Sequence, residues 1–517
     1  MKEKIKNLIL IFLIAIFCIT ISPITMQNDT YYTIAIGEHI LENGIDMKDP
    51  FSWHEDLPYT YPHWAYDVGT YLVYSLGQSV STEIGGYVAI YILTCLLAVV
   101  LGITLFKINK KICKNTIISF AITLLTIYSL KGYIAARAQL VTFILFALEI
   151  YYIESFLDTA KKRYVLGLIA IPILMANLHL AVWWFYFVLY LPYIVEYIFA
   201  KISKIEDTII LNKIQFTLNK NVKYLIIIMI VCLFTGLLTP LGTTPYTYLI
   251  KTMLGNTTAN ISKHLPMTII NHIEALVGVG IFIFILICTK TKIKLRDAFM
   301  LSGLMFLMLY SRRQQSLFFL VGGILLNKLL FETLENYKDG GVKIIENILL
   351  SKIPIALISL LVVIVSVYFI VEKEGDTFVS KSTYPVEASE WILQNLDLDK
   401  IRLYNEYNYG SYLLYKDIPV FIDSRADLYA PEFNTETRKA EDGRDIFMDF
   451  IDTSNLNVFY EDVFKKYDIT HVILYKNSKM NLIITNTNDG TYNCIYEDKY
   501  FTLYEIKEQP INLHILD

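Results

Sequence analysis

The residues best suited to chemistry lie in an acidic segment near the start of the chain. Between Met26 and Gly85, about nine acidic side chains accompany one basic residue, Lys48, among many aromatic side chains. A carboxylate beside a low-dielectric boundary has a raised pKa, so this segment can supply a general base or a metal ligand beside a lipid headgroup. A solvated acidic loop with interfacial aromatic side chains explains the same residues equally well. The candidates for substrate contacts here are Glu38, His39, His54 and His63.

Three arginines fall where apolar runs meet polar loops. They are Arg137, Arg312 and Arg313. A guanidinium group donates paired hydrogen bonds to phosphate oxygens in a geometry that lysine cannot match. The arginines are therefore candidate ligands of a phosphate or pyrophosphate. For each of them, snorkelling to lipid headgroups or pairing with loop carboxylates is the alternative.

Other polar side chains stand at the ends of apolar runs. Asn177 and His179 close one run, and Glu274 opens another. Unpaired polar groups are costly in hydrocarbon, so Asn177 and His179 are expected to face a protein-lined cavity and to contact substrate there, unless they only cap a helix. Glu274 is either a substrate-binding carboxylate or a charge that suits the N-terminus of a helix.

The composition divides the chain between lipid and water. Of its 517 residues 55% are hydrophobic and 18% charged, with a mean hydropathy of +0.45, which is too apolar for a soluble globule. The formal net charge is -4, and the part after residue 375 is the acidic part, with about 25 acidic against about 14 basic residues. This balance argues against a nucleic-acid partner.

Apolar runs predict about eleven transmembrane helices. Each run approaches the ~20 residues that cross a ~30 Å hydrocarbon core. The first is interpreted as a retained helix rather than a signal peptide, because it lacks an obvious small-residue cleavage site. The runs are Ile5–Thr25, 86–106, 116–130, 139–157, 164–178, 182–200, 223–239, 275–289, 297–310, 316–331 and 353–371.

Lysines and arginines in alternate short loops predict the orientation. Basic clusters follow Phe106, Ala160 and Thr289, and such loops usually stay in the cytoplasm. The N-terminus is then cytoplasmic, and both the large first loop, 26–85, and the C-terminal domain lie outside. The predicted location is the plasma membrane, with multiple crossings.

Two domains are expected. Residues 1–375 form the transmembrane domain, with 26–85 as its large outer loop, and residues 376–517 form a soluble extracytoplasmic α/β domain. In the latter the pattern predicts helices and strands in alternation. The helices are Pro385–Leu396 and Leu456–Tyr467, and the strands are Ile401–Tyr404, Pro419–Ile422 and His471–Tyr475.

The motifs in this order resemble those of the GT-C superfamily of multi-spanning glycosyltransferases, especially its bacterial members. Most of the chain takes part in the resemblance, although Thr239-Pro240-Leu241-Gly242 departs from the more usual Asn-Pro-x-Gly. The remaining motifs are Asp29-Thr30-Tyr31-Tyr32, Gly37-Glu38-His39-Ile40-Leu41, Asp49-Pro50-Phe51-Ser52, Pro62-His63-Trp64, Ala176-Asn177-Leu178-His179, Arg312-Arg313, Tyr409-Gly410-Ser411-Tyr412-Leu413 and Val420 to Tyr429.

The resemblance implies a GT-C-like fold and an activity. Such enzymes move a sugar from a polyprenyl-phosphate-linked donor to a glycan, lipid or protein acceptor outside the membrane. Asp29 would be the catalytic base or a metal-site residue, and Asp49 the second catalytic acidic position. An Asp-x-Asp pair is absent, so the resemblance allows a divalent cation, Mg²⁺ or Mn²⁺, without requiring one.

Two other functions stay open from the sequence. A transporter or flippase of a lipid-linked or polar solute would place ionisable residues and broken helices near the bilayer midplane, often in repeated halves. A non-catalytic membrane scaffold would use the outer domain to bind a partner. Function depends on the site and not on the fold, so a likeness of motifs alone does not separate these from an inverting glycosyltransferase.

Overall fold

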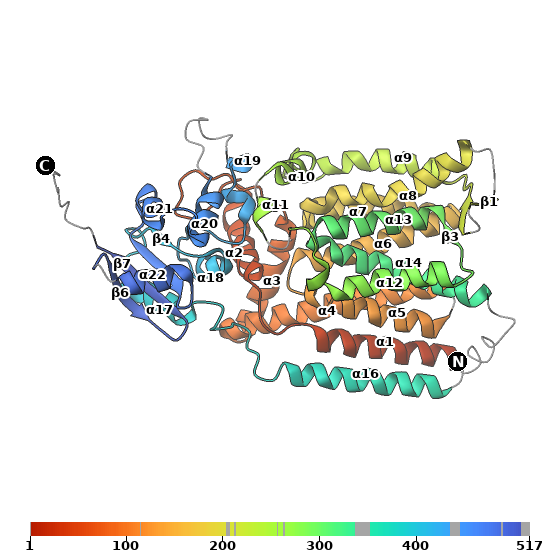
Figure 1. Cartoon of the computed structure of the whole chain (residues 1–517), viewed down its shortest axis with the longest axis horizontal. Helices are drawn as coiled ribbons and strands as arrows, with labels where there is room; N and C mark the ends of the chain where they lie inside the picture. The colour runs from red at the N-terminus through yellow and green to blue at the C-terminus, as the bar shows by residue number, and fades with distance from the viewer. Residues whose placement is uncertain are drawn as a thin grey trace. The chain divides into compact units, whose positions relative to one another are not determined.

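The computed structural model describes residues 2–113, 115–202, 207–210, 213–255, 257–261, 264–336, 352–434, 445–487 and 490–507. The chain divides into two compact units (Figure 1). The helical unit comprises residues 1–24, 88–249 and 261–375, and the mixed unit comprises 25–87, 250–260 and 376–517.

Long apolar helices make up the helical unit. α6 shows why they form, because it is apolar on nearly every side and most of its residues are buried against neighbouring helices. The helices of this unit are α1 (Lys2–Ile21), α4 (Thr82–Cys113, from Val88 onward), α5 (Thr116–Ser129), α6 (Ala138–Thr159), α7 (Lys162–Leu178), α8 (Trp183–Ile202), α9 (Val222–Cys232), most of α10 (Thr244–Leu254), α12 (Ile273–Cys288), α13 (Leu295–Tyr310), α14 (Gln315–Asn336) and α16 (Lys352–Glu372).

Five helical stretches of the described chain are long and apolar enough to cross a membrane: 4–21, 82–113, 138–159, 180–202 and 312–336. The mostly helical architecture expected from the sequence is confirmed, and each of the predicted apolar runs coincides with a helix. Four further apolar helical stretches, in α5, α9, α12 and α16, have 10–17 residues. Several are shorter than the ~20 residues of a full crossing, so the predicted count of about eleven spans stays a prediction.

A small sheet joins the loops at one end of the helical unit. β1 (Asp207–Ile210) pairs antiparallel with β2 (Ile214–Thr217), and β2 pairs in parallel with β3 (Ile293–Lys294). β3 continues directly into α13 at Leu295. The basic residues around β3 are thereby fixed beside the start of α13.

The mixed unit is built around a four-stranded sheet in the order β4-β5-β7-β6. β4 and β5 are parallel, whereas β7 pairs antiparallel with both β5 and β6. The strands are β4 (Leu403–Tyr404), β5 (His471–Tyr475), β6 (Tyr492–Glu497) and β7 (Phe501–Ile506), and the accompanying helices are α17 (Val386–Asn395), α18 (Tyr407–Tyr415), α19 (Pro431–Asn434), α20 (Ile446–Asn455), α21 (Tyr460–Lys466) and α22 (Lys479–Thr487).

The segment expected to be an outer loop of the transmembrane domain is instead a folded part of the mixed unit. It contains α2 (Asn28–Asn43) and α3 (Trp64–Val80), which pack against each other, and α2 also packs against α18. The fully buried Tyr31 ring meets the rings of Tyr384 and Tyr412 edge-on, each at 5.0 Å between centroids. Aromatic pairs of this geometry add to the free energy gained from burial. They therefore help to hold this segment within the mixed unit.

The tail agrees in part with its predicted elements. α17, β4, β5 and α21 fall within the predicted segments. The predicted strand Pro419–Ile422 is wrong, because these residues form no ladder and Val420 makes an isolated bridge to Ser52. α18, β6 and β7 were not predicted. β6 and β7 alternate many polar and aromatic residues, and that pattern is a weak strand signal.

A close approach inside the mixed unit requires glycine at position 410. A Cβ atom there would lie 2.0 Å from the carbonyl oxygen of Ile422 and 2.8 Å from Nδ2 of Asn405. Both neighbours are buried and hydrogen-bonded to each other, so neither can move aside cheaply.

We expect Gly410→Ala to destabilise the mixed unit by about 1–3 kcal/mol, the usual cost of overpacking. Gly69→Ala is the matched control, because its Cβ atom would meet nothing within 4 Å. Alanine also favours helix over glycine by up to ~1 kcal/mol. Thermal unfolding of the purified variants in detergent measures both effects. Equal melting temperatures for the two variants would contradict the prediction.

Candidate functional site

The candidate residues fall into both units. Those of the helical unit are Arg137, Asn177, His179, Glu274, Arg312 and Arg313, and those of the mixed unit are Asp29, Glu38, His39, Asp49, His54 and His63. Each set is described within its own unit below.

In the helical unit, Arg313 and His179 line one small cavity. The cavity measures ≈ 40 Å³, enough for about three waters and comparable with one phosphate group. Its other walls combine polar side chains from α6 and α14 with phenylalanines. The remaining lining residues are Gln139, Thr142, Phe143, Phe146, Val182, Phe185, Gln314, Ser316 and Leu317.

His179 is oriented by α6. Its Nδ1 lies 2.8 Å from Oγ1 of Thr142, and that hydroxyl donates to the carbonyl oxygen of Ala138 at 3.1 Å. A hydroxyl has one hydrogen to donate, so this pattern favours a proton on Nδ1 of His179. The imidazole is thereby held in the wall of the cavity that Arg313 also lines.

The other candidates of the helical unit make structural contacts. Arg312 donates from Nε to the carbonyl oxygen of Pro266 at 3.2 Å. Asn177 donates to the carbonyl oxygens of Ile173 and Leu238 at 2.8 and 2.9 Å. Glu274 accepts from Nε2 of Gln315 at 2.9 Å, and Arg137 is the N-cap residue of α6. The structure therefore brings together Arg313 and His179 but gives the others different neighbours.

In the mixed unit, Asp29 lies in the first turn of α2, and Tyr32 follows one turn later on the same side of the helix. The Tyr32 hydroxyl lies 3.2 Å from Nε2 of His63, and their rings stack with centroids 5.6 Å apart. The Nδ1 atom of His63 lies 2.8 Å from both carboxylate oxygens of Asp67. A chain of hydrogen bonds thus runs from Asp67 through His63 to Tyr32.

Asp67 is fully buried. Burial raises the pKa of its carboxyl group, and the contacts with His63 and Thr33 only partly offset this effect. A buried carboxylate that accepts from Nδ1 fixes the orientation of the imidazole and directs Nε2 towards Tyr32. This is the arrangement that holds a histidine ready to move a proton.

Asp49 takes part in a buried ion cluster. Nη1 of Arg425 donates to Asp49 at 2.7 Å, and its Nε and Nη2 atoms donate to both carboxylate oxygens of Asp423 at 2.9 and 2.7 Å. The side chains of all three residues are at most 2% exposed. Tyr429 adds a hydrogen bond to Asp423 at 2.5 Å. The turn at 423–427 therefore has a structural role in the mixed unit.

The electrostatics of Asp49 follow from this pairing. Burial alone would raise its pKa, but the Arg425 charge and the hydrogen bonds from Ser52 outweigh burial and hold the pKa below its ordinary value. The stability gained from the pair is therefore present above the unfolded-state pKa of ~4 and is lost as pH falls through the lower folded-state pKa.

The residues present do not build a metal site around Asp49. Its two oxygens already accept hydrogen bonds from Arg425, Phe51 and Ser52, and the guanidinium group occupies the position where a cation would bind. Across the described residues no group of three or more His, Cys, Asp or Glu side chains is placed to hold a metal ion.

The remaining candidates of the mixed unit also have structural partners. His54 makes a 2.8 Å hydrogen bond through Nε2 with the carbonyl oxygen of Phe421 and packs among aromatic rings. His39 contacts Asp46 at 3.3 Å, and Glu38 accepts from the Tyr71 hydroxyl at 2.8 Å. Neither of these contacts involves the Asp67–His63–Tyr32 chain.

Comparisons with known proteins connect this architecture to one group. No protein-family model matches the chain, and no curated protein matches it by sequence. Among solved structures, it matches the archaeal oligosaccharyltransferase AglB from Archaeoglobus fulgidus bound to an inhibitory peptide and a dolichol-phosphate. That match has a TM-score of 0.57 and 10% identity, and it covers 99% of this chain and 75% of the other.

Two further structures of the Archaeoglobus fulgidus oligosaccharyltransferase match at 10% identity. One is tethered to an acceptor peptide containing the NVT sequon, with a TM-score of 0.53 and coverage of 98% and 74%. The other is the apo form, with a TM-score of 0.54 and coverage of 98% and 75%. The chain therefore shares its overall fold with these structures. The resemblance drawn from its motifs is confirmed at the level of the fold, because at this identity the likeness reports fold alone.

Sequence reasoning missed several residues that the structure places beside the candidates. Asp67 stands four residues after His63, a spacing that puts both on one side of a helix and could have signalled the pair. Tyr32 was noted only as part of a motif. Arg425 carries no local signal for its contact with Asp49, because the two are 376 residues apart.

The buried ion cluster yields a stability prediction. Arg425→Met should destabilise the mixed unit by about 3–5 kcal/mol, because it leaves two buried carboxylates without their cation. Arg402→Met is the matched control, since its ion pair with Asp468 has side chains 44% and 81% exposed. Surface pairs of this kind contribute ~1 kcal/mol or less. Thermal unfolding in detergent measures the stability of both variants. If Arg402→Met lost as much stability as Arg425→Met, the structural role of the buried ion cluster would be refuted.

Proposed function

We propose that this protein is a membrane glycosyltransferase that moves a sugar from a polyprenyl-phosphate-type lipid donor to an acceptor on the outer face of the membrane. The observation that carries the proposal is the GT-C fold over nearly the whole chain, combined with a cavity lined by Arg313, His179 and phenylalanines. The related oligosaccharyltransferase has been captured with dolichol-phosphate and with an acceptor peptide. The cationic residue of the cavity suits a phosphate, and the phenylalanines beside it suit the first carbons of a prenyl chain.

The helical unit would bind the donor. Arg313 would hold the phosphate oxygens, and His179, oriented by Thr142, would add a hydrogen bond beside it. Charge builds on the phosphate as the bond to the sugar breaks. A fixed guanidinium group therefore stabilises the transition state more than the ground state, which is the requirement for catalysis.

The mixed unit would supply the base. An acceptor hydroxyl or amide would attack the anomeric carbon while the bond from that carbon to the phosphate oxygen breaks. The acceptor proton would pass to Asp29, and polyprenyl phosphate would leave with the electron pair of the broken bond. This single displacement inverts the configuration at the anomeric carbon and needs no covalent enzyme intermediate.

Asp29 suits this role better than Asp49. Asp49 is enclosed and paired with Arg425, whereas Asp29 is partly exposed at the start of α2. The neighbouring Tyr32, His63 and Asp67 would position the acceptor and shield the proton transfer. Should a divalent cation take part, Asp29 would be the residue to contact it.

Asp29→Asn should lower the rate of sugar transfer by about 10²–10⁴-fold, the usual contribution of a general base. Glu42→Gln, an exposed change on the same helix, should leave the rate unchanged. Membranes containing each variant at equal abundance would be supplied with polyprenyl-phosphate sugars, and the products measured by mass spectrometry. Full activity of Asp29→Asn would remove this residue from the mechanism. A loss of solute uptake with unchanged glycans would favour a transporter instead.

Arg313→Gln should lower kcat/KM for the lipid donor by about tenfold or more while leaving the KM for the acceptor nearly unchanged, because the lost contact is a charge-assisted hydrogen bond to phosphate that strengthens as charge builds on it. Arg312→Gln should have the smaller effect, since Arg312 bonds a backbone carbonyl group. Donor titrations with both variants make the comparison. A larger donor effect at Arg312 would exclude the cavity as the phosphate site.

A further inference from the structure

A second and larger cavity lies at the other end of the helical unit. Along α6, Glu154 in this cavity stands twelve residues after Thr142, and along α14, Lys328 stands twelve residues after Ser316. At 1.5 Å per residue, about 18 Å separates the two cavities along both helices. The proposed donor site and this cavity therefore lie near opposite ends of α6 and α14. The sequence assigns this second end to the cytoplasm, because its loops are the basic ones.

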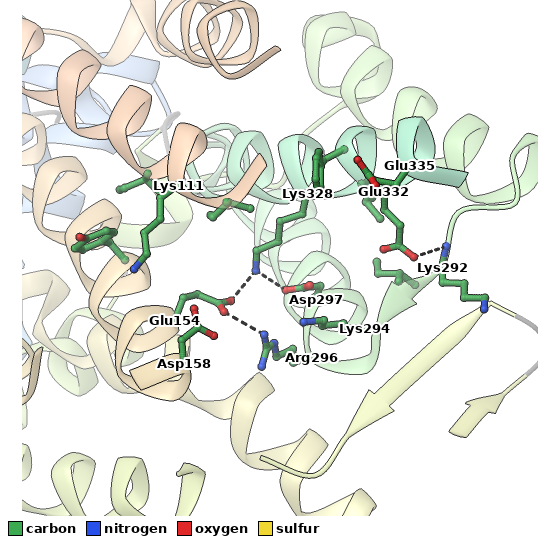
Figure 2. A pocket seen from close by; sticks show the side chains of 16 residues that line it. Lys111, Glu154, Asp158, Lys292, Lys294, Arg296, Asp297, Lys328, Glu332 and Glu335 are labelled. Carbon is green, nitrogen blue, oxygen red and sulfur yellow. Dashed lines mark hydrogen bonds and ion pairs between the residues drawn. The ribbon is translucent and has the colours of Figure 1, made fainter. Parts of the chain in front are cut away.

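The cavity has a volume of ≈ 460 Å³. Ionisable side chains from α4, α6, α13 and α14, and from the segment leading into α13, line it (Figure 2). These side chains are Lys111, Glu154, Asp158, Lys292, Lys294, Arg296, Asp297, Lys328, Glu332 and Glu335.

The floor of the cavity is a paired ionic network. Glu154 accepts from Lys328 at 2.7 Å and from Arg296 at 3.0 Å, and Lys328 also contacts Asp297 at 2.9 Å (Figure 2). The four side chains are between 8% and 17% exposed. Opposite charges that neutralise one another in this way form a rigid base rather than a ligand site.

One donor in this network lacks a partner. The Nε atom of Arg296 is buried and makes no hydrogen bond with any residue that the structure describes. The residue as a whole is only 7% exposed. A buried N–H group without an acceptor is destabilising. Because this atom has almost no accessible surface, a ligand in the cavity must be held by the side chains of the rim.

The rim carries charges of both signs. Lys111, whose Nζ atom lies 4.4 Å from the centre of the Tyr151 ring and donates to Ser155, stands on the same side as Asp158. Lysines and carboxylates are equally frequent along the rest of the rim, so the lining favours neither a simple anion nor a simple cation. Five apolar residues complete the wall, namely Ile108, Ile112, Ile293, Leu329 and Phe331.

We propose that this cavity binds a zwitterionic phosphate–ammonium group, the chemistry of a phosphoethanolamine headgroup. The phosphate accepts from Lys111, and the primary ammonium donates to Asp158. The apolar wall contacts the start of the acyl chains, which favours a lipid over a soluble ligand. The inference is independent of the sugar-transfer proposal, because it concerns the opposite end of the helices.

The test uses the full chain purified in detergent and stripped of lipid. Adding phosphatidylethanolamine should raise the melting temperature by at least ~3 °C, because a ligand that binds only the folded state stabilises it. Phosphatidylglycerol lacks the ammonium group, and phosphatidylcholine cannot donate a hydrogen bond from its quaternary nitrogen. Both should give less than a third of the effect. Equal rises in melting temperature with all three lipids, or no rise with any of them, would overturn the proposal.

Variants locate the site. Lys111→Gln and Asp158→Asn should each raise, at least tenfold, the phosphatidylethanolamine concentration needed for the rise in melting temperature. Both residues are exposed, so they can be changed without loss of fold. Lys162→Gln is the matched control, since Lys162 is an exposed lysine at the start of α7 that does not line the cavity. Wild-type behaviour of the first two variants would disprove the site. Free phosphoethanolamine is added in a separate experiment. A rise in melting temperature equal to that caused by the lipid would identify a soluble ligand with the same headgroup chemistry.

Discussion

The contact of Arg425 with Asp49 and Asp423 organises the half of the molecule that contains the proposed base. Three charges are removed from water, and this costs several kcal/mol per ion unless each finds its partners. Here each does, because one guanidinium group meets two carboxylates and the remaining acceptor positions are filled by Ser52, Phe51 and Tyr429. The segment with Asp29 is therefore a fixed part of the mixed unit rather than a free loop.

The helical unit shows the complementary principle. Much of its interior is an apolar core, and polar side chains near the two ends of α6 and α14 line two cavities. Such groups are tolerated in hydrocarbon only when they are paired or line a protein cavity. The same helices thus hold a compact site with arginine and histidine at one end and a broad site of mixed charge at the other.

The sequence predicted the helices of this protein better than their grouping. Apolar runs such as 139–157 locate helices directly, since burial along a whole helix leaves a continuous hydrophobic pattern. The assignment of 26–85 to the transmembrane domain differed because the contacts that fix this segment come from residues such as Tyr384, Tyr412 and Arg425, which lie more than three hundred positions away. Residue types indicated the chemistry proposed for Arg313 and His179. No local pattern indicated that Asp49 would be buried and paired with Arg425.

The distance in sequence between Asp49 and Arg425 has a consequence for biogenesis. The ribosome delivers Asp49 long before Arg425, which is 376 residues further along the chain. During that interval Asp49 has only its local hydrogen bonds from Phe51 and Ser52, and contacts of such long range form slowly. The buried ion cluster can therefore close only after Arg425 has been synthesised. A chain that stops before Arg425 leaves Asp49 without its cation.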